Sequence, residues 1–121
     1  MANTSYAVEY YETEDGSRPA EDFILSQNIK MQAKIFTALT FLERIGPKLR
    51  EPYSKPLGDG IFEIRAKQGN DITRVLYFFV IGKTVILTNG FQKKTPTTPP
   101  GEIEKAKRCR ADYYRRKGIQ I

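Results

Sequence analysis

The sequence predicts an α+β fold, in which a single domain spanning residues 1–121 combines a mainly antiparallel sheet with an N-terminal helical hairpin and a C-terminal helix. Apolar residues recur every three or four positions between residues 28 and 45, as in an amphipathic helix. β-Branched and aromatic residues dominate short segments between residues 60 and 88, as in strands. The helices are expected to gather on one face of the sheet, which leaves the other face free to bind a ligand.

A short strand and a short helix are predicted first. Tyr6, Val8 and Tyr10 stand at alternate positions, which is typical of a half-buried strand over residues 5–11. Pro19 suits the first turn of a helix, because proline lacks the N–H group that this turn leaves unbonded. This helix is expected to end near residue 26.

The strongest helix pattern runs from Asn28 to about Arg44. Asn28 is expected to cap the helix, because an amide oxygen can accept a hydrogen bond from the free N–H groups of the first turn. Gly46 and Pro47 are expected to end it. Its apolar stripe consists of Met31, Ile35, Ala38, Leu42 and Ile45.

The second half predicts three consecutive antiparallel strands, over residues 60–65, 72–81 and 84–88. The turns at residues 69–71 and 82–83 are short enough to join neighbouring antiparallel strands. Residues 48–56 are expected to form a loop. After a proline-rich segment, Thr98 is the expected N-cap and Pro99 the first position of a last helix that ends around Arg116.

The net charge of +6 is unevenly distributed. Residues 1–54 hold six Lys and Arg against eight Asp and Glu, a net charge of −2, whereas residues 55–121 hold fourteen against six, a net charge of +8. A positive surface attracts partners that carry phosphate. Solvated helix faces without a partner would give the same asymmetry.

The composition excludes several classes of site. The chain has no histidine and one cysteine, so histidine triads, zinc sites and an internal disulfide are excluded. No glycine-rich phosphate loop occurs, and neither a cofactor nor a metal is expected. The sequence shows no signal peptide and no apolar stretch long enough for a membrane span, so a cytoplasmic location away from membranes is expected.

The residue types that remain suit the cleavage of RNA by attack of its own 2′-hydroxyl on the adjacent phosphate. This reaction needs a base, an acid and cations around the phosphate, and lysine and arginine clusters supply them without a metal. Alternation places Glu63 and Arg65 on one side of their strand. On the last strand, alternation places Val85, Leu87, Asn89, Phe91 and Lys93 on one side.

Each candidate also has a structural interpretation. Arg65 fits an ion pair with Glu63 or Asp71 across the hairpin as well as it fits a phosphate ligand. Arg74, in an otherwise apolar strand, fits a structural ion pair as well as it fits a phosphate ligand. Phe91 fits either a base-stacking platform or the core. Lys93 and Lys94 would also protect an exposed strand end. Tyr113 and Tyr114 are also suited to packing.

Several segments together resemble the phage-type HigB branch of the RelE toxins, over nearly the whole chain. The more specific part is Gly-Phe-Gln-Lys-Lys-Thr at residues 90–95, followed by Glu102-Ile103 and Ala106. The other matching segments are Tyr10-Tyr11-Glu12, Pro19 with Asp22-Phe23, Lys55-Pro56-Leu57, Ile61-Phe62-Glu63-Ile64-Arg65 and Arg74-Val75-Leu76-Tyr77.

The resemblance implies a ribosome-dependent mRNA endonuclease that is neutralised by a HigA-like helix-turn-helix antitoxin and that contacts mRNA and ribosomal RNA. Together with the strand pattern it gives a catalytic set and an RNA-binding set. The catalytic set is Arg65, Lys93, Lys94, Arg74 and Tyr113, and the RNA-binding set is Lys55, Phe91, Asn89 and Lys67.

The chain departs from the pattern of this branch at two positions. Asn89 stands where a histidine is usual, and an amide cannot act as an acid or base. Thr97 stands where a further lysine is common. Two other functions therefore remain open: a ParE-like gyrase inhibitor, which need not keep Arg65 and the lysine pair, and a non-catalytic RNA-binding relative.

Overall fold

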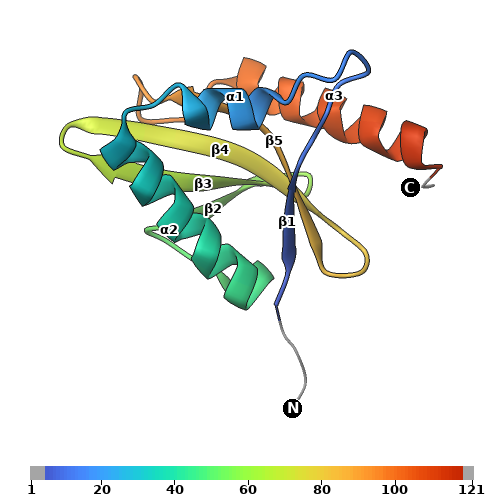
Figure 1. Ribbon diagram of the computed structural model, residues 1–121, viewed down its shortest axis with the longest axis horizontal. Helices are drawn as coiled ribbons and strands as arrows, with labels where there is room; N and C mark the ends of the chain where they lie inside the picture. The colour runs from blue at the N-terminus through green and yellow to red at the C-terminus, as the bar shows by residue number, and fades with distance from the viewer. Residues whose placement is uncertain (1–4, 119–121) are drawn as a thin grey trace.

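A five-stranded sheet lies between helices on both of its faces in the computed structural model, which describes residues 5–118 (Figure 1). The strands follow the order β1-β5-β4-β3-β2; β1 is parallel to β5 and the other neighbours are antiparallel. The strands are β1 (Ala7–Tyr10), β2 (Ser54–Gly58), β3 (Ile61–Gln68), β4 (Asp71–Val80) and β5 (Thr84–Gln92). The helices are α1 (Pro19–Leu25), α2 (Ile29–Ile45), the 3-10 turn η1 (Gly46–Lys48) and α3 (Pro100–Lys117). The predicted α+β class is confirmed.

The helices α1 and α2 cover one face of the sheet, as expected. The Asn28 side chain accepts a hydrogen bond of 2.8 Å from the Met31 N–H group, which confirms the cap of α2. Gly46 ends the helix at a φ of 54°, and a Cβ atom there would lie 2.3 Å from the Tyr6 ring. The main core lies on this face and includes Ile24, Met31, Ile35, Leu42, Ile64, Val75, Tyr77 and Leu87.

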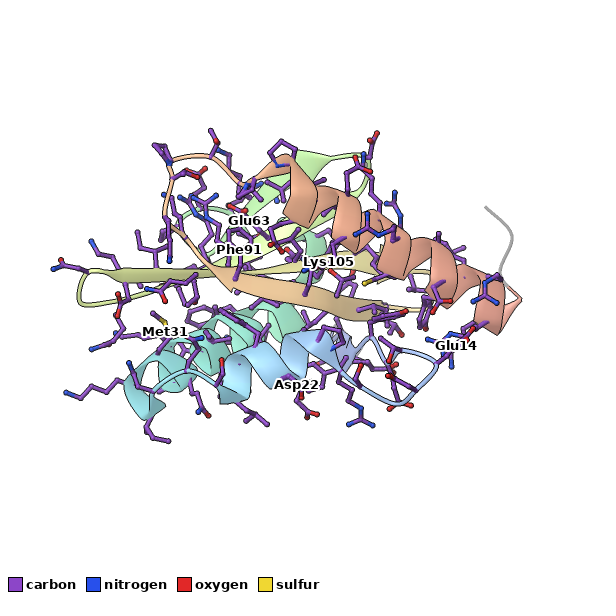
Figure 2. All side chains as sticks on the ribbon, turned by 90° about the horizontal axis from the view of Figure 1, so that it is seen from above. Glu14, Asp22, Met31, Glu63, Phe91 and Lys105 are labelled. Carbon is purple, nitrogen blue, oxygen red and sulfur yellow. The ribbon has the colours of Figure 1, made fainter. Side chains whose placement is uncertain are left out.

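The helix α3 lies on the opposite face, so the expectation that all helices share one face is wrong. Figure 2 shows the sheet nearly edge-on, with α3 on one side and α1 and α2 on the other. A second core forms where Ala106 and Cys109 of α3 pack with Leu76, Phe78 and Ile86 of the sheet. The central strands are apolar on both faces, which is why a second layer of helix covers them. Only the part of this face beyond α3 stays open.

The segment expected to be a loop, residues 48–56, contains the first residues of the edge strand β2, which pairs with the start of β3. Pro56 is accommodated there because an edge strand has a free side that needs no N–H donor. No helix among residues 5–118 is long and apolar enough to cross a membrane.

A β-bulge in β5 changes which residues share a face. Tyr77 of β4 is opposite Leu87, but Leu76 is opposite Asn89, so Thr88 is the extra residue. Consequently Val85 and Leu87 pack toward α2, whereas Asn89 and Phe91 lie on the α3 side. The prediction that all these residues share one face with Lys93 is therefore wrong for Val85 and Leu87.

The expected cap of α3 is also wrong. The N-cap is Pro99, which makes no side-chain cap hydrogen bond. The Thr98 hydroxyl instead contacts Glu63 and Arg74 in the sheet. The loop before α3 is thus fixed by tertiary contacts.

Candidate functional site

The open part of the α3 face lies beyond the N-terminal end of this helix and carries most of the candidate residues. Residues directly opposite one another in neighbouring strands project from the same face. One row across the sheet contains Lys55, Glu63, Leu76 and Asn89, and the next contains Arg65, Arg74 and Phe91. Beyond them Lys67 is opposite Ile72, and the Lys93 N–H group donates to the Ile72 carbonyl at 2.7 Å. The register therefore brings the basic residues of three strands together.

A buried ion pair between Glu63 and Arg74 lies beneath the cationic cluster, which consists of Lys55, Arg65, Arg74 and Lys93. The Glu63 and Arg74 side chains are 0% and 2% exposed, and Glu63 Oε2 lies 3.1 Å from Arg74 Nη1. The Thr98 hydroxyl accepts from Arg74 Nη1 at 2.7 Å and donates to Glu63 Oε1. The Pro96 carbonyl accepts from Arg74 Nη2 at 3.4 Å. Figure 2 shows Glu63 and Phe91 on the α3 side, near the start of α3. The pair thus ties the loop before α3 to the sheet.

Arg65 lies at the surface beside this pair. Its side chain is 25% exposed, with Nε 3.7 Å from Glu63 Oε2 and Nη1 3.7 Å from Glu51 Oε1. Both separations are longer than a charge-assisted hydrogen bond, which is about 2.7–2.9 Å. The guanidinium is therefore oriented by two carboxylates and still keeps donors for an incoming anion.

Lys93 is half-buried among other cations. Partial burial lowers the pKa of its ammonium group, and the charges of Arg74, Arg65 and Lys55 lower it further, while Glu63 opposes them. A lysine with a lowered pKa is neutral in a larger fraction of molecules near neutral pH, which a general base requires.

The other basic candidates lie around Arg65 and Lys93. Lys55, Lys67 and Lys94 are exposed. Phe91 is only partly exposed, because it packs against the core under α3. Phe91 is therefore partly a core residue, and only the exposed part of its ring is available to a ligand.

Three predicted site residues do not reach the open surface. Arg74 is buried, so it orients Glu63 and the Thr98 loop and cannot touch a substrate in this conformation. Asn89 is 2% exposed and donates to the Glu102 side chain at 3.0 Å, which anchors the first turn of α3. Tyr113 packs against the Phe78 ring, with centroids 5.8 Å apart, near the other end of α3.

Glu63, Glu51 and Thr98 were missed as site residues in the sequence. Glu63 had a usable signal, since it is an acid in an apolar strand on the same side as Arg65. No sequence pattern indicated Thr98 or Glu51, because their contacts are made with segments far away in the chain.

The arrangement suits anion binding and proton transfer. Four cations, Lys55, Arg65, Arg74 and Lys93, lie around the carboxylates of Glu63 and Glu51, so the surface keeps a net positive charge where a phosphate can bind. No group of three or more His, Cys, Asp or Glu side chains that could hold a metal occurs within residues 5–118. The available chemistry is that of guanidinium and ammonium groups.

Comparison with known proteins places the chain in a family. No curated protein matches it. The family model described as "Phage derived protein Gp49-like (DUF891)" matches residues 22–111, from α1 to the middle of α3. The match includes Lys55, Glu63, Arg65, Arg74 and Lys93. The chain therefore belongs to the phage-derived Gp49-like family, a toxin-like family related to RelE.

Proposed function

We propose that this protein is a toxin of the HigB branch that acts as an endoribonuclease on mRNA bound to the ribosome. The observation that carries the proposal is the exposed cationic cluster around Glu63, in which Arg65 is oriented and the pKa of Lys93 is lowered. Such a cluster supplies both phosphate binding and a base without a metal.

The reaction proceeds by transfer of the phosphate to the neighbouring 2′-oxygen. Neutral Lys93 takes the proton of the 2′-hydroxyl, and this oxygen attacks the phosphorus. The bond from phosphorus to the 5′-oxygen breaks, and an ammonium group of Lys55 or Lys94 gives that oxygen a proton. The products are a 2′,3′-cyclic phosphate and a 5′-hydroxyl. Arg65 stabilises the charge that gathers on the phosphate oxygens.

Membership in a toxin-like family implies an antitoxin partner. We propose a HigA-like helix-turn-helix protein whose acidic side chains cover the cationic cluster. Charge complementarity of this kind favours fast and specific association.

The test adds purified protein to translating ribosomes and maps new mRNA 5′ ends. Arg65→Ala is expected to lower cleavage by about 100-fold or more, because a donor to the developing charge is lost. Arg108→Ala is the matched control, since Arg108 is an exposed arginine of α3 outside the cluster. Intact transcripts with the wild-type protein, or equal cleavage by the two variants, would contradict the proposal.

A non-catalytic RNA-binding relative is the second candidate. It is favoured by the burial of Asn89, which stands where this branch usually has a histidine, and by the contacts of Arg65 with two carboxylates. It predicts RNA binding that weakens with salt, without cleavage and without growth arrest. DNA breaks with intact mRNA would instead indicate a gyrase inhibitor.

A further inference from the structure

Two open clefts lie next to each other beside α2: the first reaches β3, and the second is lined by α2 and the segment that follows it, up to Tyr53. The first has a volume of about 680 Å³, and its walls include Lys34, Arg65, Lys67, Pro52, Tyr53 and Ile72. The second has a volume of about 420 Å³, and its walls include Arg44, Lys48, Arg50, Phe41, Ile45 and Leu49. Glu51 and Tyr53 line both clefts and so form the wall between them.

The charge of these clefts is positive although the first half of the chain is acidic overall. Between residues 28 and 50 the chain has five basic residues and one acidic residue, Glu43. Four of the five line a cleft, and Lys30 is the exception. Arg65 and Lys67 from β3 add to the first cleft. The acids that make the first half negative lie mostly before residue 23, away from this surface.

Tyr53 gives the wall between the clefts a fixed aromatic ring. Its ring packs edge-on against Phe41 of α2, with centroids 4.9 Å apart and an interplanar angle of 65°. The residue is still 38% exposed. A held ring with an open surface and cations on both sides matches what an unpaired nucleotide requires, namely a face for base stacking and charges for the backbone.

The first cleft is continuous with the candidate site. The Tyr53 carbonyl accepts from the Arg65 N–H group at 2.8 Å, and β2 pairs with β3 only on the other side of this bond. Beyond Arg65 the edge of β3 is therefore open, and Lys67 follows directly along it. A strand whose phosphate contacts Arg65 has a positively charged path into the first cleft.

We propose that the two clefts bind successive unpaired nucleotides of single-stranded RNA, with Tyr53 between the two bases. The inference rests on the proposed function in taking RNA as the ligand of Arg65. It assigns RNA binding to α2 and to Pro52 and Tyr53, which lie outside the cationic cluster, whereas Glu51 contacts Arg65 of that cluster. The strand belongs to mRNA or to ribosomal RNA, and the experiment separates these sources.

The first test is binding of a short 2′-O-methyl RNA oligonucleotide, which lacks the hydroxyl needed for cleavage. Lys34→Glu is compared with Lys30→Glu, the same charge change on the same helix at a position that lines neither cleft. Lys34→Glu is expected to weaken binding roughly tenfold and to reduce the slope of log K against log salt by about 0.7, the effect of one lost phosphate contact. Lys30→Glu is expected to stay within about twofold of wild type.

The second test concerns stacking. Tyr53→Leu is expected to weaken binding about tenfold, whereas Tyr53→Phe, which keeps the ring, is expected to bind like wild type. An RNA that carries 4-thiouridine is expected to cross-link to the peptide that contains Tyr53. The far-ultraviolet spectrum and the unfolding midpoint of each variant verify that it is folded.

Each outcome decides between the two proposals. Equal binding by Lys34→Glu and Lys30→Glu, both to the oligonucleotide and to ribosomes without mRNA, overturns the inference even if the protein cuts mRNA. A Lys34 effect without any cleavage by the wild-type protein supports the inference and removes the proposed nuclease. A loss confined to the oligonucleotide assigns the clefts to mRNA, and a loss confined to ribosomes assigns them to ribosomal RNA.

Discussion

At the N-terminal end of α3 the carboxylate of Glu63 is buried beneath cations, whereas at the C-terminal end the carboxylate of Asp112 is surrounded by its own donors. Asp112 accepts from the Tyr11 hydroxyl at 2.6 Å, from Arg116 Nε at 2.8 Å and from Arg115. Arg115 also binds Glu14. Asp112, Arg115 and Arg116 therefore each have an opposite charge, and the network fastens α3 to the segment after β1.

The end near Glu63 has no such balance. Four cations, Lys55, Arg65, Arg74 and Lys93, face two carboxylates, the buried one of Glu63 and the exposed one of Glu51. Within the described part of the chain, Glu63 Oε2 and Arg74 Nε have no hydrogen-bond partner. Both ends combine acidic and basic side chains, so composition alone does not distinguish them. What distinguishes them is the excess of cations over acids, which leaves one end able to bind an anion.

Removal of the Glu63 charge tests this comparison between the two ends and should have the largest effect on stability. Glu63→Gln leaves Arg74 buried without a counter-charge, so we expect the free energy of unfolding to fall by about 3–5 kcal/mol. Urea unfolding measures it. The double variant Glu63→Leu with Arg74→Met is expected to recover most of the loss, because both buried charges are gone. A loss below about 1 kcal/mol in Glu63→Gln would show that the pair is solvated, like a surface pair.

The excess of cations is tested by its effect on the pKa of Lys93. The charge of Lys55 helps to lower the pKa of Lys93, so Lys55→Gln should raise this pKa. The neutral base then forms at higher pH, and the rise of the cleavage rate with pH should move to higher pH, whatever the maximal rate. Lys105→Gln, an exposed lysine of α3, is the control. Movement to lower pH would contradict the assignment of Lys93 as the base.

The balanced end should respond more weakly. Tyr11 has its pKa raised to about 12, first by burial and then by its hydrogen bond to Asp112. Asp112→Asn should lower this pKa but keep it above the ordinary value of 10, because burial remains. Ultraviolet titration of the tyrosines measures it. A Tyr11 pKa of 12 in the variant would mean that Asp112 makes no contribution.

The same contacts hold the pKa of Asp112 below its usual value. A group whose pKa is lowered by folding stabilises the protein above its unfolded pKa, and this contribution is lost as the pH falls through the folded pKa. Asp112→Asn should therefore reduce the loss of stability on acidification, as measured by the unfolding midpoint at several pH values. It should cost less stability at neutral pH than Glu63→Gln does.

The smallest effect concerns Cys109, which lies under α3 between the two ends. Burial raises the pKa of its thiol to about 11. Alkylation by iodoacetamide near neutral pH should therefore be slow in the native protein and fast in urea, because the thiolate is the reactive form. Rapid alkylation without denaturant would show that α3 leaves the sheet.

The sequence by itself determined the local elements of this protein. The three- and four-residue spacing of apolar residues identified α2, the cap at Asn28 located its start, and alternation put Glu63 with Arg65 on one side of β3. These predictions succeeded because the period of an element and the capping of its ends depend on neighbouring residues. The basic second half was also evident, although its division into a balanced and an unbalanced end was not.

Only the tertiary structure decided which of these residues meet. The bulge at Thr88 places Asn89 and Phe91 on the opposite face from Val85 and Leu87, and α3 covers Asn89. Thr98 does not cap α3 but binds Glu63 and Arg74. Lys34, Arg44, Lys48 and Arg50 contribute to a positive surface although their half of the chain is acidic overall. In each case the outcome depends on strand register and on packing between segments far apart in the chain, and a one-residue change of register reverses every side chain that follows.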